Sequence, residues 1–437
     1  MLHPDFVLAF REAAPYINNF RGKTFVIAIN GECLARGNLY GLAQDINLLV
    51  SLGVRIVLVH GARPQIEEQL RLRGTPRQFH HGRRVTDALT MEAVKSAVGG
   101  LRHDLEAFMS MGMPNSPMHG ACLRVAGGNF VTAQPLGVID GVDMQFSGRV
   151  RKIDTAAINK RLDLGELVLM SLIGYSPTGE AFNMTMEEVA CQTAIELKAE
   201  KLIFMVQSDG LVDADGVLHS AIAAEQAEAI LQRGIDSEEV RISLPFAIRA
   251  TREGVVRSHL VSHNEDGALL VELFTDFGTG TMIARDSLVK VREASIEDVG
   301  DILALIRPLQ EQGILIKRSR EHLEMQIRQY AVLEHDERIY GCVAMLPFHE
   351  DGMAELACLA ISQERRNAGF GDRLLKYVEE QARLCGLKKL FILTTQTAHW
   401  FAERGFQPAT VESLPAVRRE LYNHNRRSKV LIKPLTP

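Results

Sequence analysis

Residues 366–371 read Arg366-Asn367-Ala368-Gly369-Phe370-Gly371, a glycine-rich R-x-x-G-x-G loop. The apolar run 356–361 before it is typical of a buried strand, and the amphipathic run 374–380 after it is typical of a helix. Such a loop surrounds an anion with the free N–H groups of the first helical turn, at the positive end of the helix dipole. Glycine also lets the backbone approach a pyrophosphate closely. The stretch therefore predicts a nucleotide diphosphate ligand, as in ATP, NAD or coenzyme A.

The composition around this loop is that of a protein with two or three domains. The chain has 437 residues, of which 46% are apolar and 24% charged, and its net charge is −5. These values suit globular domains with their own cores and give no sign of nucleic-acid or membrane binding. The most apolar segment, residues 46–60, is interrupted by Arg55 and is too short to span a bilayer.

The cysteines and the N-terminus indicate the compartment. The six cysteines are widely scattered, and no CxxC pair or His/Cys metal-ligand spacing exists. A reduced cytosolic protein without a metal site is therefore favoured over a disulfide scaffold. Asp5, Arg11 and Glu12 come early in the chain, so the apolar core of a signal peptide is missing. We expect a cytoplasmic location.

Hydrophobic patterns divide the chain into three segments. Residues 1–22 contain an amphipathic helix, expected over 3–20 and interrupted at Pro15. Residues 23–285 alternate apolar strand-like runs with helical spacing, which predicts a mostly parallel sheet covered on both faces. A boundary near 283–290 is followed by Ser295-Ile296-Glu297-Asp298, a helix-capping pattern, and opens a second domain over 290–437.

The region after the glycine-rich loop identifies the second domain. Residues 400–406 read Trp-Phe-Ala-Glu-Arg-Gly-Phe, about thirty residues after the loop. The order of strands, loop, helix, strand and F-x-x-x-G-F segment resembles the GNAT acyltransferase family, which implies an α+β fold. In that family the loop holds the pyrophosphate of acetyl-CoA; the alternative is a glycine-containing turn of any α/β domain. The resemblance implies that acetyl-CoA contacts Cys358, Leu359, Ile361, Arg366, Ala368, Gly369, Gly371 and Asp372.

Acetyl transfer from a thioester sets three chemical requirements. The acceptor amine must lose a proton, the oxyanion needs a donor, and the leaving thiolate needs a proton. We expect Glu355, at the start of the strand before the loop, to be the general base; a solvated strand-end carboxylate is the alternative. The resemblance implies that backbone N–H groups of Cys358 or Leu359 polarise the carbonyl. Thr394 or Thr395 is a candidate donor to the thiolate.

Two further residues are weaker candidates for the chemistry. His399 is a second possible base, although its position is more typical of a surface residue. Cys358 is a conceivable nucleophile, but a cysteine in an apolar strand is far more often buried and inert.

Clustered arginines indicate the acceptor. Residues 414–433 contain four arginines and two lysines, and Arg318 and Arg320 precede them in the same domain. A guanidinium fork binds carboxylates bidentately, so this edge suits a small molecule with two carboxylates. The alternative is a basic exposed edge. Arg318, Arg418 and Arg427 are the expected substrate contacts.

The first domain resembles the amino-acid kinase family, and acetylglutamate kinase in particular. Matching phrases occur in order at residues 59–66, 84–87, 128–130, 199–202, 208–210 and 266–281. The resemblance implies a three-layer αβα fold.

The departures from the kinase pattern indicate that its chemistry is lost. Residues 28–31 read Ala-Ile-Asn-Gly without the kinase lysine, residues 60–63 have lost two of three loop glycines, and Ile242-Ser243-Leu244-Pro245 replaces the late lysine segment. Phosphoryl transfer needs positioned cations, so we expect neither ATP use nor kinase activity.

A retained fold without its chemistry predicts a regulatory role. The resemblance to arginine-inhibited kinases implies an L-arginine site made by Tyr16 in the N-terminal helix, Lys201, Glu272, Gly278 and Gly280. A carboxylate pairs with a guanidinium, and a glycine-rich turn offers carbonyls. The alternative is a local role for Glu272 beside an ordinary turn.

The two domains together resemble the bacterial N-acetylglutamate synthase family. This implies acetyl transfer from acetyl-CoA to L-glutamate, the first step of arginine biosynthesis, with inhibition by L-arginine, no metal, and a homo-oligomer, expected to be a hexamer. Two alternatives are an acetylglutamate kinase with an appended GNAT domain and an arginine sensor that binds both ligands without turnover.

Overall fold

The structure of the protein is a computed structural model. It describes residues 4–35, 39–112, 116, 118–121, 123–275, 278–286, 289–335, 338–363, 369–424 and 426–435. Residue contacts divide the chain into two compact units, Met1–Ser287 and Leu288–Pro437. No helix within the described ranges is both long and apolar enough to cross a membrane.

A mainly parallel sheet organises the first unit. Its order is β14-β16-β15-β13-β1-β2-β10-β5, and only the β15–β16 pair is antiparallel. Its strands are β1 (Thr24–Ile29), β2 (Arg55–His60), β5 (Val125–Gly127), β10 (Leu167–Met170), β13 (Lys201–Val206), β14 (Ala221–Ala223), β15 (Arg257–Ser262) and β16 (Thr281–Ala284).

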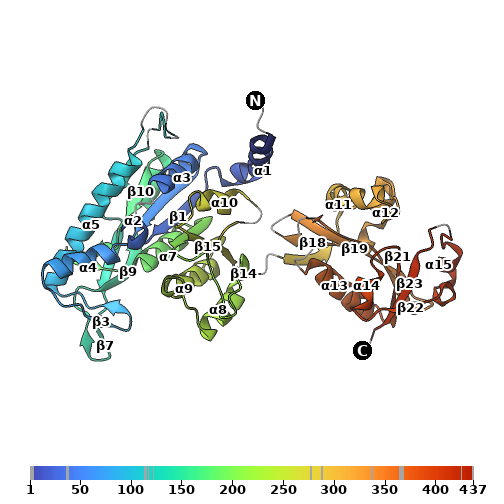
Figure 1. Ribbon diagram of the computed structural model, residues 1–437. Coiled ribbons are helices and arrows are strands. Elements are labelled where there is room, and N and C mark those ends of the chain that lie inside the picture. The colour runs from blue at the N-terminus through green and yellow to red at the C-terminus, as the bar shows by residue number, and fades with distance from the viewer. Residues whose placement is uncertain are drawn as a thin grey trace. The chain divides into compact units, whose positions relative to one another are not determined.

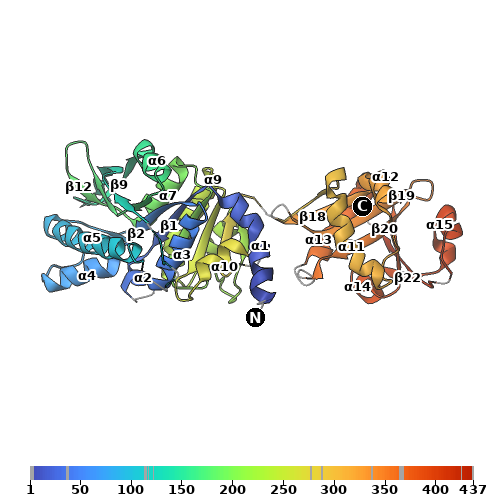
Figure 2. The same cartoon turned by 90° about the horizontal axis from the view of Figure 1, so that it is seen from above.

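Helices cover both faces of this sheet, as Figures 1 and 2 show. Side chains alternate along β1: Phe25, Ile27 and Ile29 join one core, and Val26 and Ala28 join the other. The first core includes α1 (Pro4–Phe20), α2 (Gly31–Ala35), α3 (Leu39–Ser51), α4 (Arg63–Leu72), α5 (Ala88–Met109) and α10 (Ala268–Phe274). The second includes α6 (Thr155–Asp163), α7 (Met186–Glu196), α8 (Ala224–Arg233) and α9 (Glu238–Arg252). The predicted three-layer αβα arrangement is confirmed.

Smaller strands extend the first unit beyond the main sheet. A four-stranded sheet has the order β12-β11-β6-β9, and two hairpins pair β3 with β4 and β7 with β8. These strands are β3 (Phe79–His80), β4 (Arg83–Arg84), β6 (Val131–Pro135), β7 (Val138–Ile139), β8 (Val142–Asp143), β9 (Gly148–Ile153), β11 (Ile173–Tyr175) and β12 (Ala181–Asn183).

The expected interruption at Pro15 is wrong, because α1 continues through this residue to Phe20. A proline inside a helix removes one backbone hydrogen bond, and packing on either side can offset that loss. Tyr16 and Phe20, which follow the proline, both pack against the core of the first unit. Tertiary contacts therefore outweigh the local preference.

The second unit is built on a seven-stranded sheet with the order β17-β18-β19-β20-β21-β23-β22. Only the β20–β21 pair is parallel. The strands are β17 (Val289–Glu293), β18 (Tyr330–His335), β19 (Arg338–Phe348), β20 (Met353–Ile361), β21 (Lys389–Thr394), β22 (Gln407–Ala409) and β23 (Lys429–Pro434).

The helices of the second unit also divide between the two faces of its sheet. One core contains α11 (Val299–Glu311) and α12 (Arg320–Gln326), and the other contains α13 (Phe370–Leu384). Short helices are α14 (Ala398–Ala402), α15 (Ala416–Glu420), η1 (Ile296–Asp298), η2 (Ile327–Gln329) and η4 (Val411–Ser413).

The predicted capping pattern at residues 295–298 is confirmed. The side chains of Ser295 and Asp298 form a reciprocal capping box at the start of η1. Arg292 donates two hydrogen bonds to Asp298, at 2.7 and 2.9 Å, and a third to Glu334. The Arg292 hydrogen bonds lower the pKa of Asp298 to about 2. The beginning of the second unit is therefore tied to β18.

Candidate functional site

The parallel strands β20 and β21 separate and open a cavity in the second unit. Their pairing covers three residue pairs, from Met353–Lys389 to Glu355–Phe391, with no further pair between them in the described chain. Beyond this point, residues 356–359 and 392–394 line a cavity of about 140 Å³. Backbone groups that a continuous ladder would have used can therefore face a ligand.

A β-bulge distorts β20 beside this cavity. Cys342 pairs with Ala360 and Ala344 with Ala357, so Cys358 and Leu359 lie opposite a single residue of β19. Cys358 has a φ of 54°, which is rare for a residue with a Cβ. The bulge turns the backbone of Cys358 and Leu359 out of the ladder, and both residues line the cavity.

Glu355 and Arg418 form a buried ion pair at the same cavity. Arg418 Nε lies 2.5 Å from Glu355 Oε2, and Arg418 Nη2 lies 3.0 Å from Glu355 Oε1. Glu355 is 4% exposed, so the alternative of a solvated strand-end carboxylate is wrong. The general base and one of the substrate arginines were expected as separate groups. The structure places them in one bidentate pair between β20 and α15.

Of the other two expected substrate arginines, Arg318 and Arg427, only one lines the cavity. Arg318 lines the cavity, and its guanidinium donates to the hydroxyl of Tyr330. Arg427 is exposed and is not a lining residue, whereas its neighbour Arg426 is. Arg426 Nη2 donates to the carbonyls of Gly313, at 3.2 Å, and Ile314. The described lining therefore includes Arg318, Arg418 and Arg426, and the expected substrate contact by Arg427 stays a prediction.

Thr394 lies at the cavity and also stabilises the turn that follows β21. Its Oγ1 accepts a hydrogen bond from the Thr397 N–H at 3.1 Å and lies 2.9 Å from Thr397 Oγ1. Thr394 and Thr397 both line the cavity, while Thr395 does not. His399 is exposed and paired with Glu403, as expected of a surface residue.

The glycine-rich loop leads into α13 as expected from the sequence. Gly369 is the N-cap of this helix and has a φ of 72°, in the left-handed region that favours glycine. Arg366 and Ala368 lie outside the described residues. Ile361 ends β20, where it pairs with Gly341 of β19.

Contacts between the loop and residues 400–404 explain why the two motifs occur together. A Cβ on Gly371 would lie 3.0 Å from Trp400 Cζ2, so glycine allows the indole to pack on the helix start. Arg404 stacks 3.9 Å over the Trp400 ring and is ion-paired with Asp372. The Arg404 hydrogen bond lowers the pKa of Asp372. The cation neutralises a carboxylate that would otherwise repel a diphosphate at this helix end.

In the first unit, Lys201, His259 and Glu272 form a buried chain of polar contacts. Lys201 Nζ lies 3.1 Å from His259 Nε2, and His259 Nδ1 lies 2.7 Å from Glu272 Oε1. Burial, and then the charge of Lys201, lower the pKa of His259 to about 4. The neutral ring therefore donates from Nδ1 to Glu272 and accepts at Nε2 from Lys201. The sequence analysis did not identify His259. The signal that could have found it is a histidine within a buried strand.

The glycine-rich turn closes on the carboxylate of Glu272. The N–H groups of Thr279 and Gly280 donate to Glu272 Oε2 at 2.8 and 2.9 Å. Gly278 has a φ of 57°, and a Cβ there would lie 2.3 Å from the same oxygen. A Cβ on Gly280 would lie 2.1 Å from the Leu260 carbonyl oxygen. Both glycines are therefore required by close approach.

Tyr16 belongs to the same region through α1. Its ring is 6.0 Å from that of Phe20, whose centroid lies 5.2 Å from Lys201 Nζ. The structure thus gathers all five residues predicted for arginine from the N-terminal helix, β13, α10 and the following turn.

Burial of Lys201 predicts a pH-dependent stability of the first unit. Burial lowers the pKa of Lys201 from 10.5 to about 7. Between these values the unfolded chain binds a proton that the folded chain does not, so stability rises with pH, by at most about 1.4 kcal/mol per pH unit. From pH 7 to pH 9 we expect the unfolding free energy of the wild type to rise relative to that of Lys201→Met, which lacks the titrating amine. Urea unfolding followed by circular dichroism measures it, and a pH-independent difference would contradict the prediction.

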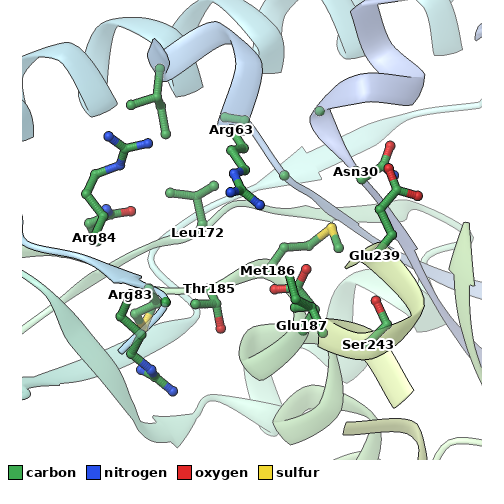
Figure 3. Close-up of a pocket in the computed structure, with 18 of the residues that line it drawn as sticks. Asn30, Arg63, Arg83, Arg84, Leu172, Thr185, Met186, Glu187, Glu239 and Ser243 are labelled. Carbon is green, nitrogen blue, oxygen red and sulfur yellow. The ribbon is translucent and has the colours of Figure 1, made fainter. Parts of the chain in front are cut away.

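A second cavity, of about 190 Å³, is lined in the first unit by residues of both altered kinase loops, 30–31 and 61–63 (Figure 3). Its described lining includes Arg63, Arg83 and Arg84 but no lysine. Each of these arginines is ion-paired, with Glu238, Glu188 and Glu67 respectively. The two altered kinase loops contact each other, since the Gly61 N–H donates to the Ile29 carbonyl at 2.8 Å.

Comparisons with sequence families agree with the two units. The Amino acid kinase family matches residues 23–262, and the Acetyltransferase (GNAT) domain matches residues 326–408. The chain is 52% identical over 432 residues to an amino-acid acetyltransferase of Pseudomonas paraeruginosa, covering 99% of this chain and 100% of the relative. A relative of the same description from Azotobacter vinelandii is 51% identical over 431 residues, with the same coverage.

The comparison with solved structures agrees with the sequence comparison. N-acetylglutamate synthase from Neisseria gonorrhoeae, complexed with coenzyme A and L-arginine, is similar with a TM-score of 0.89 and 41% identity, covering 99% of this chain and 100% of that one. The same synthase complexed with coenzyme A and N-acetyl-glutamate is similar with a TM-score of 0.64, 42% identity and the same coverage.

Proposed function

This chain belongs to the amino-acid acetyltransferase family, and we propose that its acceptor is L-glutamate, converted in the cytoplasm with acetyl-CoA to N-acetyl-L-glutamate and CoA. The observation that carries the proposal is the cavity between β20 and β21, which combines a buried carboxylate with three arginines. The relative from Neisseria gonorrhoeae, whose structures hold coenzyme A with L-arginine or N-acetyl-glutamate, supports it.

The residues at this cavity suit direct attack of the amine on the thioester. Glu355 accepts the proton of the ammonium, directly or through water, which frees the lone pair for attack. The backbone N–H groups of Cys358 and Leu359 at the bulge stabilise the oxyanion. Thr394 donates to the departing thiolate. Arg318 and Arg418, which line the cavity, bind the two carboxylates of glutamate together with Arg427 or its neighbour Arg426.

The ion pair of Arg418 with Glu355 has a consequence for this mechanism. Arg418 orients the carboxylate in the ligand-free protein, and a glutamate carboxylate that reaches Arg418 would compete for the same guanidinium. Substrate binding would then release the Glu355 carboxylate from Arg418 and free its oxygens to meet the ammonium.

We assign different roles to the two domains. Residues 290–437 carry the catalysis, with acetyl-CoA held by the loop before α13. Residues 23–285 serve regulation and assembly and not phosphoryl transfer, since the described lining of the cavity in Figure 3 contains no lysine. Residues 1–22 contribute to both regulation and assembly. The reaction as proposed uses no ATP and no metal.

Turnover of the full-length protein tests the proposal. The protein is incubated with acetyl-CoA and each amino acid in turn, and free CoA is measured by chromatography. Glutamate-dependent CoA release supports the proposal, and no release with glutamate would refute it. An acetylglutamate kinase would require ATP, and a non-catalytic sensor would bind acetyl-CoA without releasing CoA.

We further propose that L-arginine inhibits through the residues around Glu272. In a Glu272→Gln variant the carboxylate that would pair with the guanidinium is replaced by an amide. Arginine inhibition is expected to weaken by at least tenfold, on the basis that a charge-assisted pair contributes about 1.5–3 kcal/mol. The rate without arginine serves as the control and should change little. An unchanged arginine dose response would remove Glu272 from the site.

A homo-oligomer, proposed to be a hexamer, is supported by the surface of α1. Phe6 and Phe10, four residues apart on one helix face, are 67% and 60% exposed, and their rings stack at 5.9 Å. An exposed apolar patch of this kind is typical of an interaction surface. A Phe6→Glu/Phe10→Glu variant is expected to sediment as a smaller species than the wild type. An unchanged sedimentation coefficient would show that α1 does not hold the assembly.

A further inference from the structure

Two hairpins of the first unit meet at their tips. His81 and Gly82 connect β3 to β4, and Asp140 and Gly141 connect β7 to β8. All four residues have a positive φ, between 46° and 83°, which is the pattern of two-residue type I′ turns. The labels β3 and β7 lie next to each other in Figure 1, and His81 Nε2 lies 2.7 Å from Asp140 Oδ2.

The contact between the hairpins assembles three metal-binding side chains. His80, His81 and Asp140 each offer a donor atom, and these atoms lie within 4.8 Å of one another. His80 Nε2 is buried without a hydrogen-bond partner, and the His80 and His81 rings are 4.3 Å apart. Two imidazoles and a carboxylate are the ligands of zinc and neighbouring divalent metals, with a water in the fourth position.

The charges around the three donors do not oppose a cation. Arg83 and Arg84 follow the turn, but Arg83 is paired with Glu188 and Arg84 with Glu67. The buried nitrogen of His80 also distinguishes this group from an ordinary surface pair. His219 and Asp213 form such a pair at 2.8 Å, and no third donor joins them among the described residues.

We propose that His80, His81 and Asp140 bind one divalent late first-row transition metal ion, for which Zn²⁺ is the probe. The ion would replace the direct His81–Asp140 contact and clamp the two hairpins together. Phe79, Gly82 and Arg83 of the first hairpin also line the cavity of Figure 3, so the clamp would stabilise one wall of that cavity. The absence of a metal-ligand spacing in the sequence is consistent with this site, because its donors come from two separate hairpins.

Isothermal titration of the metal-free full-length protein with Zn²⁺ tests the proposal. One ion per chain is expected. His80→Ala, His81→Ala and Asp140→Asn should each weaken binding by at least tenfold, since even changes to residues that hydrogen-bond to metal ligands cost about 10–100-fold. His219→Ala is the matched control, because it removes a histidine from a similar His–Asp pair and should leave binding unchanged.

Hydrogen exchange provides a second readout that does not depend on activity. Zn²⁺ should slow exchange of residues 79–84 and 138–143 in the wild type, and the effect should be lost in His80→Ala. No saturable Zn²⁺ binding would overturn the proposal. So would equal weakening by His219→Ala, or loss of the single bound ion on replacing the exposed thiol in Cys385→Ser.

Discussion

Acetyl transfer by a Glu355→Gln variant is expected to be about 10²–10⁴-fold slower than in the wild type, the range that general acid–base catalysis contributes. The amide keeps the shape of the side chain but cannot accept the proton of the ammonium. Measuring kcat and the KM for glutamate over a range of pH separates a loss of proton transfer from a loss of substrate binding. The loss should appear in kcat.

A matched control separates loss of the base from loss of an ion pair. Glu379 on α13 is also a largely buried glutamate of the second unit, paired with Lys433 at 2.5 Å, and it does not line the cavity. Glu379→Gln should therefore keep a near-normal kcat. If Glu355→Gln retains the wild-type rate at every pH, Glu355 is not the base, although the proposed reaction would stand.

Replacing Arg418 by methionine is expected to destabilise the second unit by about 3–5 kcal/mol. Methionine preserves much of the length of the side chain, but the buried carboxylate of Glu355 then has no partner, and breaking a buried pair from one side has a cost of this size. The KM for glutamate should rise as well, because a cavity guanidinium is lost. The single tryptophan of the chain, Trp400, lies in this unit, so its fluorescence during urea unfolding reports on the correct domain.

The double variant Glu355→Gln/Arg418→Met shows whether the stability lost in Arg418→Met is due to the unpaired carboxylate of Glu355. Without either charge, no buried carboxylate is left uncompensated, so much of the lost stability should return. Activity should not return, because the base is still absent. A double variant as unstable as Arg418→Met alone would show that Arg418 stabilises the unit through packing and not through Glu355.

The sequence does not distinguish the roles of the two neighbouring arginines Arg426 and Arg427. Residues 426 and 427 are adjacent and identical, so no periodicity separates them. The structure places Arg426 at the cavity, where it donates to the Gly313 and Ile314 carbonyls, and leaves Arg427 exposed. The choice depends on how the loop before β23 folds back onto a segment about 110 residues earlier in the chain.

The sequence by itself determined the two folds, the glycine-rich loop before α13, the missing lysines of the kinase-like domain, and the identity of most candidate residues. The loop and the alternation of strands and helices rest on local periodicity and turn chemistry, which act between near neighbours in the chain. The two fold families and the missing lysines rest on the resemblance of ordered sequence motifs to known families. Only the tertiary structure decided that Glu355 pairs with Arg418, that β20 bulges at Cys358, and that His81 meets Asp140. Those contacts depend on strand register and loop closure between residues far apart in sequence, and local patterns carry no information about either.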